Sequence, residues 1–170
     1  IDLERSPYSI KNYKAYKQLV NFINKEKIDY IHCNTPVGGM LGRLAGKKCK
    51  VKKVIYQVHG FHFYEGAPKK NWLIYYPIEK YLAKLTDAII TINKEDYKYA
   101  KSFDLRNNGS AYYVPGVGID LAGYADHSLL RKRMRQELQL KSSDYAIISV
   151  GELNDNKNNK VIIKAIAKLK

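Results

Sequence analysis

The sequence predicts an α/β fold built on a Rossmann-like, open parallel sheet, and three features of the 170 residues indicate it. Short runs that are apolar throughout alternate with longer segments whose apolar residues recur at helical spacing. Strands of that kind are typical of a parallel sheet that helices cover on both faces. A composition of 45% hydrophobic and 27% charged residues is that of a folded chain with a real core.

Four apolar runs in the first two thirds of the chain are expected to form this sheet. The expected strands are 29–33, 53–58, 87–92 and 111–114, with helices at about 10–25, 38–46 and 71–85 and a fourth helix after residue 93. Pro77 would kink the third helix or mark a break in it. Asn93 is the expected N-cap of the fourth helix, and Glu95 and Asp96 in its first turn suit the helix dipole.

The pattern changes after the segment PGVGID at 115–120. A polar, basic helix at about 128–138, a strand at 145–150 and the start of another helix follow. We expect a partial N-terminal Rossmann-like domain at 1–120, an interdomain segment with the basic helix at 121–144, and the start of a second α/β domain at 145–170. The first residue is not Met and the last helical pattern has no C-cap glycine, so an internal piece of a longer protein is expected.

The chain is strongly basic, with 30 Lys and Arg against 16 Asp and Glu and a net charge of +14. Nucleic acid, an anionic membrane surface or phosphorylated substrates could explain the excess, and so could a lysine-rich organism. The helix at 69–85 mixes Trp72, Tyr75, Tyr76 and Tyr81 with lysines, which could form an aromatic belt on a membrane or pack on the sheet. We expect no nucleic-acid partner, because no recognised nucleic-acid motif is present.

Polar side chains stand where the first two predicted strands end. His32, Asn34 and Thr35 lie at the end of the first strand, and His59 and His62 follow the second. Ligands of open α/β sheets bind outside the carboxyl ends of the strands. Histidines there could act in acid/base chemistry, bind a sugar hydroxyl or stabilise a phosphate, or they could simply cap a turn.

The two cysteines, Cys33 and Cys49, do not form the disulfide framework of a small secreted domain. We expect both to be reduced and the compartment to be cytoplasmic. His32, Cys33, His59 and His62 have no spacing of a closed zinc site, and Cys33 is expected to point into the core. No metal is therefore expected.

The loop 151–159 lies between the last predicted strand and a helix, and it begins with Gly151. The free N–H groups of the following helix and the ammonium of Lys157 could hold a phosphate, but the loop could equally be an ordinary polar turn. It is not a P-loop, because the GK[ST] ending is missing.

Several motifs in a fixed order resemble bacterial family-4 retaining glycosyltransferases of the GT-B fold, nearest the capsule and exopolysaccharide group. The motifs are HCNTPVGGMLGRLAG, YQVHGFHFYEGAP, NWLIYYPIEKYLAKLTDAIITINKEDY, YYVPGVGID and SVGELNDNKNNKVIIKAIAKLK. The resemblance implies two Rossmann-like domains that face a cleft. The N-terminal domain would bind the acceptor, and the C-terminal domain, here represented only by its first β-α unit, would bind a nucleotide-sugar.

The resemblance also assigns roles to residues. His59 would be the catalytic residue beside the donor sugar, and the acceptor side of the cleft would include His32, Asn34, Thr35 and His62. The interdomain hinge would contain Pro115, Gly116 and Gly118, and the donor diphosphate would lie at Gly151, Glu152 and Lys157. Glu152 stands where the family usually has Arg, which puts the two-cation clamp in doubt, and Asn34 stands where relatives often have a second His.

The expected reaction needs no cofactor or metal, and the expected donor is a nucleotide-sugar, UDP-sugar first. The partners implied are a lipid-linked or saccharide acceptor and an anionic membrane surface, with the protein cytoplasmic or peripheral at the inner face of the cytoplasmic membrane. The chain alone should be inactive and could self-associate through an exposed sheet edge. The alternatives are a basic membrane-docking module or a nucleic-acid-binding module without catalysis.

Overall fold

A computed structural model describes residues 1–4, 6–116, 118, 120, 127–155 and 157–169. The chain divides into two compact units, residues 1–118 and residues 119–170. The first unit contains the sheet and its helices, and the second contains two further helices.

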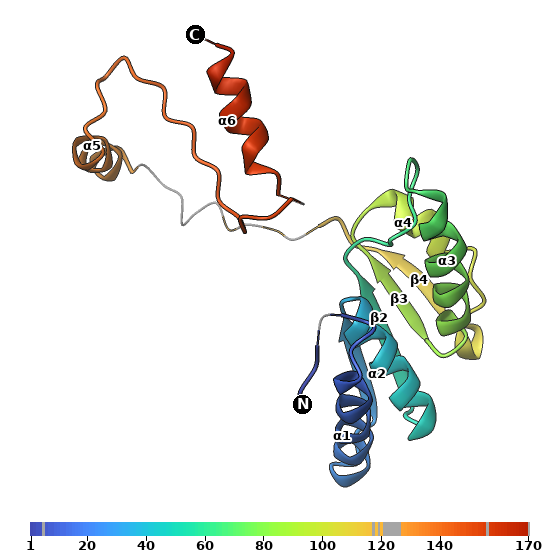
Figure 1. Cartoon of the computed structure of the whole chain (residues 1–170). Coiled ribbons are helices and arrows are strands. Elements are labelled where there is room, and N and C mark those ends of the chain that lie inside the picture. Colours follow the sequence, from blue (N-terminus) through green and yellow to red (C-terminus); the bar gives the residue numbers. More distant parts are fainter. Residues whose placement is uncertain (5, 117, 119, 121–126, 156, 170) are drawn as a thin grey trace. The chain divides into compact units, whose positions relative to one another are not determined.

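The first unit is built on a four-stranded sheet with the strand order β1-β2-β3-β4 (Figure 1). The strands are β1 (Tyr30–Asn34), β2 (Lys53–Val58), β3 (Ala88–Thr91) and β4 (Ser110–Tyr113). All neighbouring pairs are parallel. The predicted α/β fold with an open parallel sheet is therefore confirmed.

Three helices connect successive strands of this sheet: α2 (Pro36–Lys48), α3 (Lys69–Ala83) and α4 (Lys94–Ala100), the last followed by a short 3₁₀ turn, η1 (Arg106–Asn108), before β4. Helix α1 (Lys11–Lys25) precedes β1. Helix α1 packs on α2, α2 packs on β1 and β2, and α4 packs on β3 and β4. Helix α3 continues through Pro77, so of the kink and the break that the sequence allowed there, the break is wrong. The predicted N-cap is confirmed, because the Asn93 side chain accepts a hydrogen bond from the backbone N–H of Asp96.

The helices cover one face of the sheet. Each strand lies beside the next one in sequence, so right-handed crossovers place α2, α3 and α4 on the same side. That face carries buried side chains such as Val54 and Ile89, whereas Ile55 and Ile90 on the opposite face are half-buried. Among the described residues, the expectation that helices cover both faces is thus wrong.

The aromatic residues of α3 are divided between the interior and the surface. Trp72 and Tyr76 lie 5.4 and 5.2 Å, ring centre to ring centre, from the buried Phe63. Tyr75 is half-buried, and of the predicted aromatic belt only Tyr81 is exposed. The belt packs mainly inward because the side of a helix that meets the sheet must be apolar.

The second unit contains α5 (Ser128–Glu137) and α6 (Asn159–Ala167). The predicted strand at 145–150 is wrong, since these residues belong to no strand. A strand is defined by backbone pairing, and no described segment pairs with this one. Its side chains are therefore in solvent, with Tyr145 97% and Val150 92% exposed.

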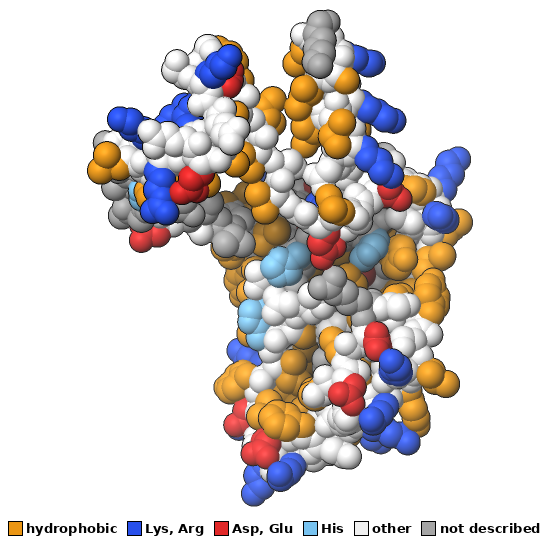
Figure 2. Space-filling model, turned by 60° about the vertical axis from the view of Figure 1, so that its left-hand side comes forward, with side chains coloured by type: hydrophobic (Ala, Val, Ile, Leu, Met, Phe, Trp, Pro, Cys, Tyr) orange, Lys and Arg blue, Asp and Glu red, His pale blue; other side chains and the backbone are white. Residues whose placement is uncertain are grey.

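The surface carries its positive charge in many places. In the view of Figure 2, Lys and Arg side chains are scattered between apolar and acidic ones and do not form one continuous patch. None of the helices in the described part of the chain is long and apolar enough to cross a membrane.

Candidate functional site

The carboxyl ends of β1 and β2 bring two predicted site residues together. These strands are parallel, with Asn34 opposite Gln57 in the register, so His59 emerges beside the end of β1. The His59 Nε2 atom lies 3.2 Å from Asn34 Oδ1. Because an amide oxygen can only accept, Nε2 donates in this contact, and in the neutral ring Nδ1 then keeps its lone pair. His59 is exposed, and that lone pair can accept a hydrogen bond from a ligand hydroxyl.

The segment 59–68 between β2 and α3, the histidine loop, carries His59 and His62 and is anchored by its apolar residues. Phe61 and Phe63 alternate with the two histidines and are 6% and 0% exposed. Their rings stack on each other at 4.6 Å. Burial of the phenylalanines therefore turns the two histidines outward, where they can meet a ligand.

His62 lies between the loop and α3. Its ring contacts the ring of Tyr75 at 4.6 Å, and its backbone carbonyl accepts a 2.9 Å hydrogen bond from Asn71 Nδ2. These two contacts from α3 fix both the backbone and the ring of His62.

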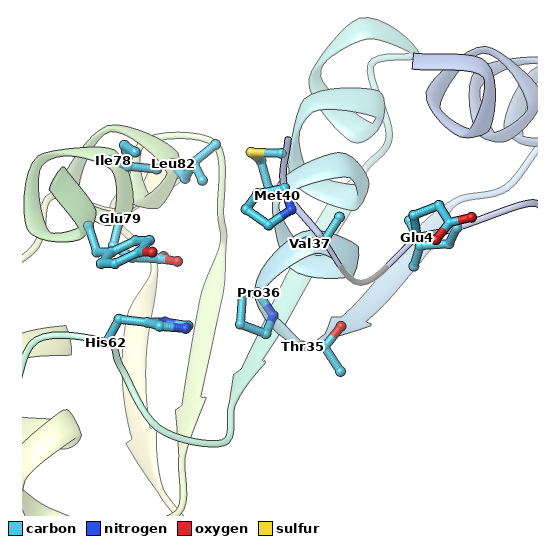
Figure 3. Close-up of a pocket in the computed structure, with 12 residues that line it drawn as sticks. Glu4, Thr35, Pro36, Val37, Met40, His62, Ile78, Glu79 and Leu82 are labelled. Carbon is cyan, nitrogen blue, oxygen red and sulfur yellow. The ribbon is translucent and has the colours of Figure 1, made fainter. Parts of the chain in front are cut away.

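A cavity of about 500 Å³ opens beside His62 (Figure 3). It lies between α2, α3 and the N-terminal segment, and Figure 3 shows His62 on the side opposite Thr35 and Pro36. Most of the lining is apolar, with a few polar groups among it. The lining residues are Leu3, Glu4, Pro7, Thr35, Pro36, Val37, Met40, His62, Tyr75, Ile78, Glu79 and Leu82.

Thr35, which precedes α2 at the edge of this cavity, has an unusual backbone conformation. Its φ of 62° with ψ of 157° is strained for a β-branched residue. A Cβ atom at Gly38 would come within 3.0 Å of Thr35 Oγ1, so the small residues after Thr35 leave room for its side chain. Strain of this kind often marks a functional site.

A buried ion pair lies beside this cavity, whose wall includes one of its members, Glu79. Arg43 on α2 is 0% exposed, and its guanidinium donates to both carboxylate oxygens of Glu79 on α3, at 2.7 and 3.1 Å. Its Nε donates to the Gly39 carbonyl at 2.9 Å, and the guanidinium lies 3.9 Å from the centre of the Tyr56 ring. The pair fixes α2 against α3 and holds a carboxylate at the cavity wall.

His32 is not part of this arrangement. Cys33 faces α2, where a Cβ at Gly42 would come within 2.9 Å of Cys33 Cβ. Alternation along the strand therefore puts His32 on the opposite face of the sheet. Burial raises the pKa of the Cys33 thiol to about 11, so it is protonated at neutral pH. Within the described ranges, no group of three or more His, Cys, Asp and Glu side chains could hold a metal ion.

In the second unit, the loop before α6 brings Gly151 and Lys157 together. A Cβ at Gly151 would lie 3.5 Å from Lys157 Cγ. The backbone N–H of Lys157 donates to Asn154 Oδ1 at 2.8 Å, and Asn154 Nδ2 donates to the Glu152 carboxylate at 2.9 Å. The structure thus places a glycine, a lysine and the start of a helix side by side, with the Glu152 carboxylate hydrogen-bonded within the loop.

The predicted hinge residues lie at the end of the first unit, which closes at Gly118. Gly116 has a φ of 61°, a conformation that glycine adopts without strain. Pro115 and Gly116 are exposed, as expected for residues that join two units.

The sequence-based prediction missed the Arg43–Glu79 pair and Asp96. One signal for Arg43 was available, since before the last turn it is the one charge in a helix of small and apolar residues, four positions after Gly39. Asp96 was identified only as a helix-dipole residue, although it is 3% exposed and reaches the histidine loop.

The first unit is an α/β fold with an open parallel sheet, and a comparison with family models identifies the family. A model of the "Glycosyl transferase 4-like" family matches residues 1–93. The chain belongs to this family. The match includes the two strand ends, the histidine loop and α3.

Curated relatives extend the similarity over the rest of the chain. The chain is 42% identical to "Putative glycosyltransferase EpsD" of Bacillus subtilis over 173 residues, covering 100% of the chain and 45% of the relative. It is 30% identical over 149 residues to "UDP-Gal:alpha-D-GlcNAc-diphosphoundecaprenol alpha-1,3-galactosyltransferase" of Escherichia coli, covering 88% and 38%. An uncharacterized protein in the cps region of Klebsiella pneumoniae is 27% identical over 87% of the chain and 41% of the relative. The chain spans less than half the length of these relatives.

Proposed function

We propose that the protein transfers a sugar from a nucleotide-sugar, UDP-sugar first, to an acceptor hydroxyl, with retention at the anomeric carbon. The observation that carries this is His59 at the end of β2, exposed and hydrogen-bonded to Asn34, in a chain of the glycosyl transferase 4-like family. In the transfer, the bond from the anomeric carbon to the diphosphate breaks and a bond to the acceptor oxygen forms. The nucleoside diphosphate leaves with the bonding electrons, and the acceptor hydroxyl passes its proton to the leaving diphosphate.

His59 would orient the donor sugar. Its Nε2–H is engaged by Asn34, so its Nδ1 lone pair is available to accept from a sugar hydroxyl. A hydrogen bond that strengthens as charge develops on the sugar stabilises the transition state more than the ground state.

The test of this role is His59→Ala in the full-length protein, measured as release of nucleoside diphosphate with an acceptor present. We expect kcat/KM to fall by about 10²-fold or more. His127→Ala is the matched control, because His127 is exposed in the second unit. Activity of His59→Ala within twofold of the unaltered protein would contradict the role.

The donor diphosphate would lie at Gly151, Lys157 and the start of α6. Support comes from the contact of Lys157 with Gly151 and from the free N–H groups of a helix start, which favour anions. Cations and N–H groups there would stabilise the leaving group, so electrostatics would supply most of the rate enhancement without a metal. Glu152 would weaken such a site unless its hydrogen bond from Asn154 keeps the carboxylate turned away.

The isolated chain should be inactive, because it spans less than half the length of the relatives that it matches. We expect weak UDP binding or none, measured by titration calorimetry. Micromolar affinity would contradict this expectation.

A lipid-linked acceptor would fit the cavity beside His62. The cavity is large enough for several carbon units, and its wall combines apolar side chains such as Met40 and Ile78 with the Glu79 carboxylate. The Escherichia coli relative is named for a diphosphoundecaprenol acceptor. Met40→Trp should raise the KM for a prenyl-diphosphate-linked acceptor and leave the KM for the donor unchanged, whereas an equal rise in both would contradict the assignment.

A membrane surface would bring such an acceptor to the protein. The outward face of α3 has Leu73 and Ile74 at 78% and 46% exposed, between Lys70 and Lys84 at its two ends. Lysines around an apolar centre favour an anionic bilayer, here at the inner face of the cytoplasmic membrane. Liposome sedimentation should show binding that needs anionic lipid and that Leu73→Ser weakens, while Tyr8→Ser at another exposed site does not.

The isolated chain is also expected to self-associate, through the uncovered face of the sheet and the exposed apolar side chains of the second unit. Light scattering should show species larger than a monomer, and a clean monomer at high concentration would contradict this.

Nucleic-acid binding without catalysis is the alternative that the net charge of +14 keeps open. It predicts affinity for single strands that falls steeply with salt. A filter-binding assay without such a slope would remove it.

A further inference from the structure

The loop that carries His59 and His62 is tied to α4 by one buried carboxylate. Asp96 stands in the first turn of α4 and is 3% exposed. Its Oδ1 atom accepts a 3.2 Å hydrogen bond from the backbone N–H of Phe61, a residue 35 positions earlier in the chain. Phe61 is itself buried and lies between the two histidines.

Capping of α4 alone does not explain this contact. The cap is made by Asn93, whose Oδ1 accepts from the Asp96 N–H at 2.8 Å, and Asn93 Nδ2 donates to Asp96 Oδ2. One carboxylate oxygen of Asp96 therefore serves the cap, while the other points to the loop. A buried carboxylate is stable only when its oxygens are hydrogen-bonded, so the Phe61 N–H and Asp96 stabilise each other.

The loop needs such an anchor because of its glycine. Gly60 has a φ of 129°, and nothing lies within 4 Å of the place where a Cβ would be. Glycine restrains the backbone least, so the segment after it, which carries His62, would vary in position relative to His59 if Phe61 were not held. The bond to Asp96 and the stacking of Phe61 on Phe63 fix the chain directly after this pivot.

The neighbour of Asp96 holds the far end of the same loop. The backbone N–H of Glu65 donates to the side chain of Glu95. Two consecutive acidic residues of α4 thus bind two backbone amides of the loop, one at its buried start and one at its exposed end.

We infer that Asp96 is the positioning residue of the histidine loop: it fixes Phe61 and thereby holds His59 and His62 in the geometry that sugar transfer requires. The catalytic part of this inference rests on the proposed function. The structural part does not, since the state of the loop can be measured without substrate.

Three variants separate positioning from capping. Asp96→Ala removes both acceptors, Asp96→Asn keeps an oxygen for Phe61 but loses the acceptor for Asn93 Nδ2, and Asn93→Ala removes the cap while leaving Oδ1 for Phe61. The first readout is hydrogen exchange of the Phe61 amide by NMR in the 170-residue chain. We expect protection to fall about tenfold in Asp96→Ala, relative to buried strand amides, and to stay near normal in the other two.

The second readout is kcat and donor KM in the full-length protein. Misplacement of a catalytic group costs up to about 100-fold, so we expect kcat of Asp96→Ala to fall by that order with little change in KM. Asp96→Asn should restore most of it, and Asn93→Ala should lower the melting temperature more than kcat. Equal losses in Asp96→Ala and Asn93→Ala, or unchanged Phe61 exchange in Asp96→Ala, would overturn the inference. If His59→Ala stays active while Asp96→Ala still frees Phe61, the proposed function fails and the anchoring stands.

Discussion

The two units of this chain differ in how deeply they bury similar apolar residues. In the first unit, Val54, Phe63 and Ile89 are 0% exposed between the sheet and its helices. In the second, Ile148 and Ile163 are 82% and 69% exposed, and none of the described residues is buried. A stable core needs two packed layers, and within the described residues the first unit alone supplies both a sheet and its covering helices.

The largest predicted effect lies at the buried ion pair of the first unit. Arg43→Ala leaves the Glu79 carboxylate without its partner, and we expect a loss of about 3–5 kcal/mol in the free energy of unfolding. Urea denaturation followed by tryptophan fluorescence reports it, because Trp72 lies in the first unit.

The double variant Arg43→Met with Glu79→Leu is the control, since an apolar pair leaves no unpaired charge. It should lose clearly less stability than Arg43→Ala alone. If both lose the same amount, volume at this position matters and the ion pair does not.

A smaller effect is expected at Asp87, which joins the start of β3 to β2 and η1. Burial alone would raise the pKa of this carboxyl, but hydrogen bonds from Arg106, the Val54 N–H and Asn107 outweigh it and hold the pKa below its ordinary value of 3.8. A carboxyl whose pKa is lowered in the folded state stabilises the fold at every pH above its ordinary pKa. That stability is lost as the pH falls through the lower pKa of the folded state.

Asp87→Asn should therefore cost about 1–3 kcal/mol at neutral pH, and the difference from the unaltered chain should shrink as the pH drops below 3.8. Thermal melts across this pH range measure it. A difference that does not depend on pH would show that the charge of Asp87 has no part in its effect.

The smallest effect is expected in the second unit. Ile163→Ala should change the unfolding free energy by less than about 0.5 kcal/mol, because the side chain is 69% exposed. The matched change Ile89→Ala, at 0% exposed, should cost about 2–5 kcal/mol. Similar losses of unfolding free energy at the two sites would mean that the second unit has a core of its own.

The same contrast explains what the sequence could predict. The strand at 53–58 has the predicted bounds, and the other strands of the first unit lie within two residues of theirs, because fully apolar runs between turns are a strong signal for parallel strands. The run at 145–150 carries the same signal, but a strand needs a partner and no local pattern reveals whether one is present.

Contacts between residues far apart in the sequence were harder to predict. The hydrogen bond between His59 and Asn34 follows from the strand topology, because both residues stand at the ends of neighbouring parallel strands. The reach of Asp96 to Phe61 spans 35 residues and depends on how α4 packs, which helical periodicity does not contain. The aromatic residues of α3 were ambiguous for the same reason, since Trp72 and Tyr81 lie on different sides of one helix.

The partner of His59 has a consequence for how the site responds to its surroundings. The amide of Asn34 has no proton to gain or lose near neutral pH, so its oxygen accepts from Nε2 in the same direction throughout. An imidazole at position 34 could donate or accept and would itself titrate, coupling two rings. With asparagine there, the tautomer of the neutral His59 ring is set by a group whose polarity is constant, so the outward-facing nitrogen is the acceptor of that ring.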